Sequence, residues 1–164
     1  IHYAEQCERV VIFRPHNVYG PNMGWDHVLP KFVLRLEELK RTQSGDAPLP
    51  FEIQGNGEQS RAFVFLDDFI SGVRLLLDKG EHLNVYNIGT RDEIKIREFA
   101  QRVAKTMGLT IRIVPSEPAK GGTLRRCPDI WKLESLGYAT KTSLDEGLQV
   151  SVDWYLANLP EEKK

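Results

Sequence analysis

Strand-like and helix-like segments alternate along this chain, and the alternation restricts its fold more than any other feature. The runs rich in β-branched and aromatic residues, which predict strands, are residues 9–14, 51–54, 62–66, 83–88 and 110–114. The runs in which apolar residues recur every three or four positions, which predict helices, are residues 29–39, 70–77, 96–107 and 144–159. This order indicates an α/β chain, whose ligands are expected beyond the carboxyl ends of the strands.

Local signals predict where two of these helices begin. Asp67 and Asp68 precede the second helical run, and carboxylates at this place commonly cap a helix N-terminus. Neighbouring positions on a helix point in different directions, so we do not expect the two carboxylates to share a metal ion. Ser143 and Glu146 have the spacing of a capping box before the last helix. A further short helix is expected within residues 128–136.

Composition excludes several classes of partner. The chain has 164 residues, enough for one domain, and its 22 basic and 23 acidic residues are interleaved, so we expect no nucleic acid partner. No apolar run reaches the roughly 18 residues of a membrane-spanning helix, and no signal-peptide pattern opens the chain. Cys7 and Cys127 are far apart, which argues against a zinc site and a disulfide framework. We therefore predict a cytoplasmic protein with no metal and no membrane partner.

Four segments resemble, in the same order, those of one enzyme family. They are RPHNVYGP at residues 14–21, GNGEQSRAFVFLDD at 55–68, VYNIG at 85–89 and PDIWKLESLGYATKTSLDEGL at 128–148. The first resembles the RPxNxYGP stretch of extended short-chain dehydrogenases, the NAD-dependent epimerase/dehydratase family that acts on nucleotide sugars. One such match would be weak, but four in order over almost the whole chain are specific to the family.

The same resemblance implies that the chain is the C-terminal part of a Rossmann-type extended short-chain dehydrogenase. The family's glycine-rich cofactor loop and its Tyr-x-x-x-Lys catalytic pair lie upstream of RPxNxYGP and are absent here; Tyr3 is followed four positions later by Cys7. We expect residues 1–164 to form a single substrate-binding lobe of short strands and helices, with no catalytic residue. An N-terminal half of roughly 150 residues would bind most of the NAD or NADP, and the intact enzyme is expected to be a homodimer.

The resemblance implies contacts with the diphosphate and the sugar of a nucleotide diphosphate sugar. Asn17 follows a strand, and its amide can donate to and accept from ligand oxygens, although it could simply close a turn. Arg61 can offer a planar fork of donors to phosphate, the alternative being an exposed surface arginine. His27 and Val28 stand at a helix start, where free amides attract anions. For His27, a capping role is the alternative.

Nucleobase and cofactor contacts rest on the resemblance alone. The segment FEIQ matches the strand that lies along the nucleobase, which implies backbone contacts from Glu52, Ile53 and Gln54. Pro15 and His16 match backbone positions near the nicotinamide, and for the His16 side chain we expect a passive role in the loop.

One loop departs from the family pattern. Family members often carry an arginine and an aspartate where this chain reads PAKGGT, at residues 118–123. Lys120 could supply the positive charge, whereas the aspartate that would hold the ribose is replaced by Gly122. Arg125 and Arg126 are alternative phosphate partners. The identity of the substrate therefore stays open.

In the intact enzyme, the resemblance implies that a tyrosine removes a sugar hydroxyl proton as hydride passes to NAD. This chain would supply affinity and orientation, and alone it is predicted to be inactive. The expected activity is like that of a nucleotide-sugar 4-epimerase, with dehydratase, reductase and decarboxylase types as alternatives. Two other hypotheses are a non-catalytic sugar-nucleotide-binding or regulatory member of the same fold, and a structural remnant that binds no ligand.

Overall fold

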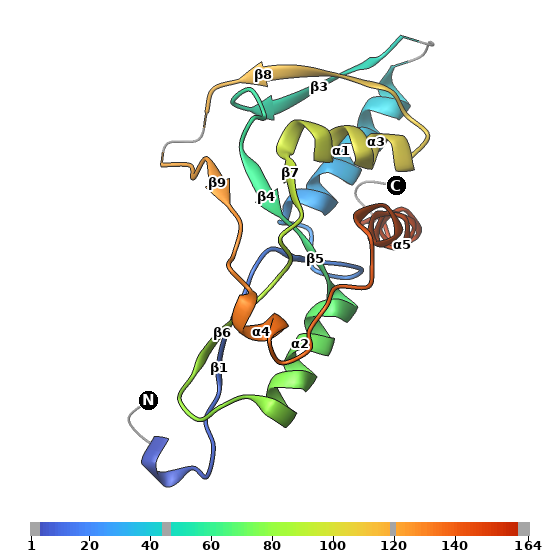
Figure 1. Cartoon of the computed structure of the whole chain (residues 1–164). Coiled ribbons are helices and arrows are strands. Elements are labelled where there is room, and N and C mark those ends of the chain that lie inside the picture. Colours follow the sequence, from blue (N-terminus) through green and yellow to red (C-terminus); the bar gives the residue numbers. More distant parts are fainter. Residues whose placement is uncertain (1–3, 44–46, 119–120, 161–164) are drawn as a thin grey trace.

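The computed structural model describes residues 4–43, 47–118 and 121–160, in which strands and helices alternate (Figure 1). The helices are α1 (Val28–Thr42), α2 (Leu66–Lys79), α3 (Ile96–Thr106), the short α4 (Trp131–Glu134), α5 (Leu144–Ala157) and a 3-10 turn, η1 (Ala4–Gln6). The strands are β1 (Ile12–Pro15), β2 (Val18–Tyr19), β3 (Leu49–Gln54), β4 (Ser60–Ala62), β5 (Val64–Phe65), β6 (Val85–Ile88), β7 (Glu93–Lys95), β8 (Ile111–Ser116) and β9 (Arg125–Arg126).

Most of the strand pairs are parallel. β1 pairs with β6, β2 with β5 and β3 with β8, each in parallel, while β4 lies between antiparallel β7 and parallel β9. The predicted helices are present, and so are the predicted strands, except that residues 62–66 are divided among the end of β4, β5 and the first residue of α2. The sequence did not indicate β2, β7 and β9, which have only two or three residues and so show no alternation of apolar and polar side chains.

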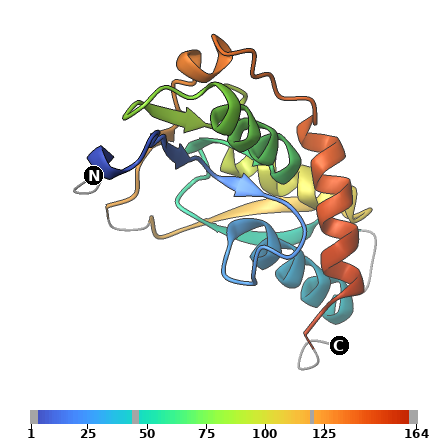
Figure 2. The same cartoon turned by 90° about the horizontal axis from the view of Figure 1, so that it is seen from below.

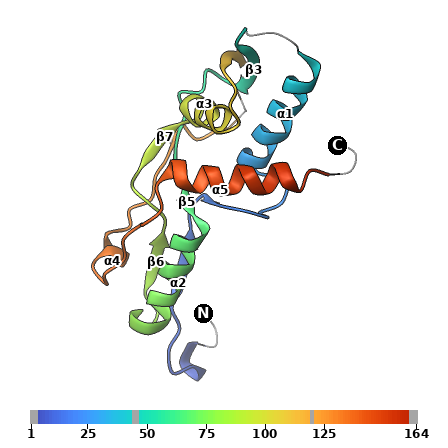
Figure 3. The same cartoon turned by 90° about the vertical axis from the view of Figure 1, so that its right-hand side faces the viewer.

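Two separate apolar clusters hold these elements together. In the larger one, α1, α3 and α5 pack around β3 with Phe51, Phe99 and Tyr155 fully buried. In the smaller one, α2, β6 and α4 contribute Leu76, Ile88 and Leu133. Helix α5 lies between the level of α1 and α3 and that of α2 (Figure 3). Seen from below, α2 lies beside the β1–β6 pair (Figure 2).

Strand β1 has fewer neighbours than its sequence predicts. The run at residues 10–13 is typical of a buried strand that is paired on both sides, yet in the described residues β1 pairs only with β6. Phe13 is 42% exposed, and its ring makes an edge contact with Phe69 of α2, 6.1 Å between centroids. The other edge of β1 is consequently open in the described part of the chain.

The capping box of α5 is confirmed. The Ser143 hydroxyl accepts a bond from the Glu146 amide at 3.3 Å, and the Glu146 carboxylate accepts one from the Ser143 amide at 2.9 Å. The Ser143 hydroxyl also donates to this carboxylate, at 2.6 Å. This bond and the one from the Ser143 amide hold the pKa of Glu146 below its usual value, because both stabilise the ionised form.

The predicted cap of α2 is wrong. The helix begins at Leu66 with Phe65 as its N-cap and has no side-chain cap bond, because β5 leads directly into the first turn. Asp68 therefore stands inside the helix, only 3% exposed, and its carboxylate accepts bonds from the amides of Lys141 at 2.9 Å and Thr142 at 3.0 Å. Asp67 is exposed. Asp68 thus ties α2 to the segment that leads into α5.

No helix within the described ranges is long and apolar enough to cross a membrane.

Candidate functional site

A cavity of about 720 Å³ lies between α1, the end of β3, β4 and the segment before β9. Five of the residues predicted to bind substrate line it: Asn17, Val28, Ile53, Gln54 and Arg61. They come from four stretches that are far apart in the sequence, so the fold brings together most of what the resemblance assigned.

One wall of the cavity is a single face of α1. Val28, Lys31, Phe32 and Arg35 lie three, four and seven positions apart, the spacing at which helical side chains share a face. Lys31 forms an exposed ion pair with Asp26, 3.4 Å between Nζ and Oδ1. Glu38 of α1 and Asp26 also line the cavity, so this wall combines an apolar surface with charged groups of both signs.

Arg61 lies on the strand side of the cavity. Its Nη1 donates to the Ser60 carbonyl at 2.7 Å and its Nη2 to the Thr123 carbonyl at 2.8 Å, which uses two of its five N–H donors. Arg126 of β9 is its partner in the strand register. Burial and the nearby charge of Arg126 lower the pKa of Arg61, although an arginine remains charged at neutral pH. An anion bound here would relieve the repulsion between the two guanidinium groups.

The position of Asn17 is compatible with both of the roles that the sequence left open. Its backbone is left-handed, with φ 42°, and its Nδ2 donates to the Ala62 carbonyl at 2.9 Å. The residue therefore closes the turn after β1 and also lines the cavity, where its amide oxygen can accept a bond.

The carbonyl groups at the end of β3 have partners within the protein. Arg35 donates to the Glu52 carbonyl at 2.6 Å and lies over the Phe51 ring, 4.4 Å from its centroid. The Ser116 hydroxyl donates to the Ile53 carbonyl at 3.1 Å. Glu52 does not line the cavity. Ile53 and Gln54 do line it.

The remaining predicted residues lie outside the cavity lining. His27 is the exposed N-cap of α1, without a side-chain cap bond, next to Val28. Pro15 and His16 lie at the end of β1, and His16 Nε2 is 3.2 Å from the Asn87 side-chain oxygen. This histidine thus has a partner that the sequence did not indicate.

The loop with the altered family pattern forms one edge of the cavity. Pro118, Gly122 and Thr123 line it, while Lys120 falls outside the described residues. Of the two arginines after this loop, Arg125 is bound to Glu93, with its Nε 3.0 Å from the carboxylate.

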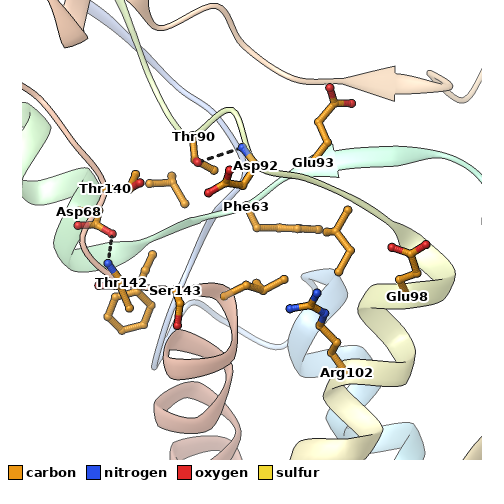
Figure 4. A pocket seen from close by; sticks show the side chains of 14 residues that line it. Phe63, Asp68, Thr90, Asp92, Glu93, Glu98, Arg102, Thr140, Thr142 and Ser143 are labelled. Carbon is orange, nitrogen blue, oxygen red and sulfur yellow. Dashed lines mark hydrogen bonds between the residues drawn. The ribbon is translucent and has the colours of Figure 1, made fainter.

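A second cavity, of about 270 Å³, is less suited to an anionic ligand (Figure 4). Four carboxylates line it, those of Asp68, Asp92, Glu93 and Glu98. Among the described residues, one cation lines it, Arg102, which forms an ion pair with Asp145 at 3.1 Å. Phosphate groups would be repelled here. Over the described ranges, no group of three or more His, Cys, Asp or Glu side chains is placed to hold a metal ion.

Sequence reasoning missed several cavity residues. Lys31 and Arg35 follow Val28 at helical spacing, a signal that was available in the sequence. Gln59 and Phe63 are each two positions from Arg61, so in an extended segment they share its face. Only the strand assignment was needed to connect them with Arg61.

Comparison with known proteins gives consistent matches. A model of the NAD-dependent epimerase/dehydratase family matches residues 1–89. GDP-L-fucose synthase 1 of Arabidopsis thaliana is 35% identical over 149 residues, 88% of this chain and 45% of that protein. The dTDP-glucose 4,6-dehydratase of Streptomyces venezuelae, solved with NAD bound, superposes with a TM-score of 0.79 and 30% identity over 99% of this chain and 49% of its own. The UDP-glucose 4-epimerase of Thermotoga maritima, solved with UDP-glucose, superposes with a TM-score of 0.77 and 28% identity. The match covers 92% of this chain and 47% of that protein.

The chain spans about half the length of these relatives. The structural likeness confirms the predicted fold class, an α/β chain with parallel strands that covers part of a Rossmann-type short-chain dehydrogenase.

Proposed function

Because the chain belongs to the NAD-dependent epimerase/dehydratase family, we propose that it is the substrate-binding portion of an enzyme that acts on a nucleotide diphosphate sugar. The cavity beside Arg61 carries this proposal. It is about 720 Å³ in volume, has an apolar and charged wall on α1, and places a partly buried guanidinium where a diphosphate would fit.

The residues on the strand side of the cavity indicate which way round the ligand lies. One face of this segment carries, in order, Phe63, Arg61 and Gln59. Asn17 lies at the Phe63 end, because its side-chain amide donates to the carbonyl of the neighbouring Ala62. With the diphosphate at Arg61, the sugar lies toward Asn17 and the nucleoside toward Gln59. Binding energy from the nucleotide then positions the sugar, which is the contribution of this chain to catalysis.

The residues of this chain do not form a binding site for NAD. The described part of the chain has no glycine-rich turn that opens a helix, and Pro15 and His16 could contribute only an edge contact at the end of β1. We therefore assign the cofactor and the catalytic pair to an N-terminal half outside this sequence. Residues 1–164 alone are then without turnover.

Two reactions have specific support. Likeness to a UDP-glucose 4-epimerase favours 4-epimerisation, while likeness to a dTDP-glucose 4,6-dehydratase over 99% of the chain favours dehydration. Both need the same placement of a nucleotide sugar, so the binding proposal holds for either.

Ligand binding tests this function directly. We expect UDP-glucose, GDP-mannose or dTDP-glucose at millimolar concentration to raise the melting temperature of the purified protein, because a ligand that binds only the folded state stabilises it. Free glucose and free mannose are the controls and are expected to leave the melting temperature unchanged, since they lack the diphosphate. If none of the nucleotide sugars has an effect, the proposal is wrong.

A further inference from the structure

We propose that Gln59 accepts a hydrogen bond from a ribose hydroxyl of the bound nucleotide, and that it thereby makes the cavity selective for nucleotides that carry this hydroxyl. This rests on the proposed function and names one determinant of its specificity. No base needs to be assigned, because the ribose is common to all ribonucleotides.

The Gln59 side-chain oxygen is buried without a hydrogen-bond partner. Among the side-chain nitrogen and oxygen atoms of the described residues, it is the only buried one in this state. Buried polar groups are nearly always paired, because an unpaired one loses its bonds to water without replacement. Gln59 lines the cavity, so a ligand there can supply the missing donor once the amide turns toward it.

The amide of Gln59 is only loosely held. Its Nε2 makes a single long bond, 3.4 Å to the Gln54 carbonyl. The terminal torsion of a glutamine has a broad energy profile, so its amide can turn toward a ligand at little cost. The oxygen can therefore reach a donor in the cavity.

The position of Gln59 points to the ribose. Alternate residues of an extended segment are about 7 Å apart, so Gln59 is one such step from Arg61 along the face that lines the cavity. Asn17 lies at the opposite end, next to Phe63. In a nucleoside diphosphate, the ribose directly follows the phosphate, so it comes to lie near Gln59 when the diphosphate is at Arg61.

The chemistry of the surroundings fits a hydroxyl donor. Gly122, which also lines the cavity, has no side chain that could accept a bond from the ribose. An amide oxygen is a neutral acceptor, and beside a diphosphate it avoids the repulsion that a carboxylate would meet. Gln59 can thus accept a bond from a ribose hydroxyl without weakening phosphate binding.

The test compares ribonucleotides with deoxyribonucleotides. Dissociation constants of UDP, GDP and their 2′-deoxy and 3′-deoxy analogues are measured by calorimetry with the full-length protein and with Gln59→Met, which keeps the length of the side chain and removes the acceptor. We expect the unaltered protein to bind the ribonucleotide about threefold to tenfold more tightly than one of the two analogues, the value of one hydrogen bond. In Gln59→Met the same ratio should be close to one.

Two further variants separate this role from a general effect on the fold. Gln59→Glu retains an acceptor and should keep the preference for ribonucleotides, even if its charge weakens all the ligands together. Gln101→Met, on the exposed side of α3, is the matched control and should keep both the affinity and the ratio.

Failure of this inference can be told apart from failure of the proposed function. Equal affinities for ribonucleotide and both analogues in the unaltered protein would overturn the role of Gln59 while the proposed function stood. An unchanged ratio in Gln59→Met would do the same. If no nucleoside diphosphate binds the unaltered protein, the proposed function itself is wrong. Equal affinities in the unaltered protein would overturn the inference even if a variant does not fold.

Discussion

Replacement of Arg61 by alanine is expected to weaken the binding of UDP or GDP roughly 10- to 150-fold, the range for hydrogen bonds to a charged group. The reason is that some of its N–H donors are not used within the protein. Bonds to the Ser60 and Thr123 carbonyls fix the guanidinium beside β4, and its other N–H groups are left for phosphate. The same change also releases the Thr123 segment, so the loss should lie toward the upper end. Calorimetric titration measures it.

Two variants control this prediction. Arg61→Lys retains the charge but not the planar fork, and we expect it to recover only part of the affinity. Arg112→Ala removes an exposed arginine of β8 that lines neither cavity, and it should bind like the unaltered protein. Affinities that agree among all three variants would show that phosphate is not bound at Arg61.

Replacement of Asp68 by alanine should lower the free energy of unfolding by about 3 kcal/mol, because each buried donor left without a partner costs about 1–3 kcal/mol. Two backbone amides, those of Lys141 and Thr142, would lose the carboxylate that accepts their bonds. Urea denaturation followed by circular dichroism measures the change.

The neighbouring carboxylate is a natural control. Asp67 is exposed on α2, and Asp67→Ala should change the free energy of unfolding by less than about 0.5 kcal/mol. Asp68→Asn keeps one acceptor oxygen and should fall between the two. Similar values for Asp67→Ala and Asp68→Ala would contradict the anchoring role of Asp68.

Asp68 also illustrates where prediction from the sequence ends. Capping preferences identify residues that suit a helix start, but they do not say which residue begins the helix. The partners of Asp68 are 73 and 74 positions away, and those contacts exist only in the folded chain. The capping box of α5 was predictable because its two members are three residues apart and bind each other.

The same distinction holds for the candidate site. Arg61 and Asn17 stand in motifs, so the resemblance led to them. Gln59 stands in the same motif as Arg61, yet its importance depends on the burial of one oxygen, which no spacing reveals. The partner of His16, Asn87, is likewise 71 positions away. Short strands such as β9 could not be predicted for a different reason, because two residues show no periodicity of apolar and polar side chains.

The two apolar clusters make the folded chain a pair of units with unequal resistance to local opening. The cavity is formed by α1, β3 and β4, and the larger cluster supports it, whereas β1 and β6 depend on the smaller cluster and on each other. Parallel pairs of only two strands are weak by themselves. Amide protons of β1 and β6 can therefore exchange with solvent through openings that leave the cavity closed. If the proposed function is correct, we expect a nucleotide bound in the cavity to lengthen the lifetime of one unit and to leave the other to open as before.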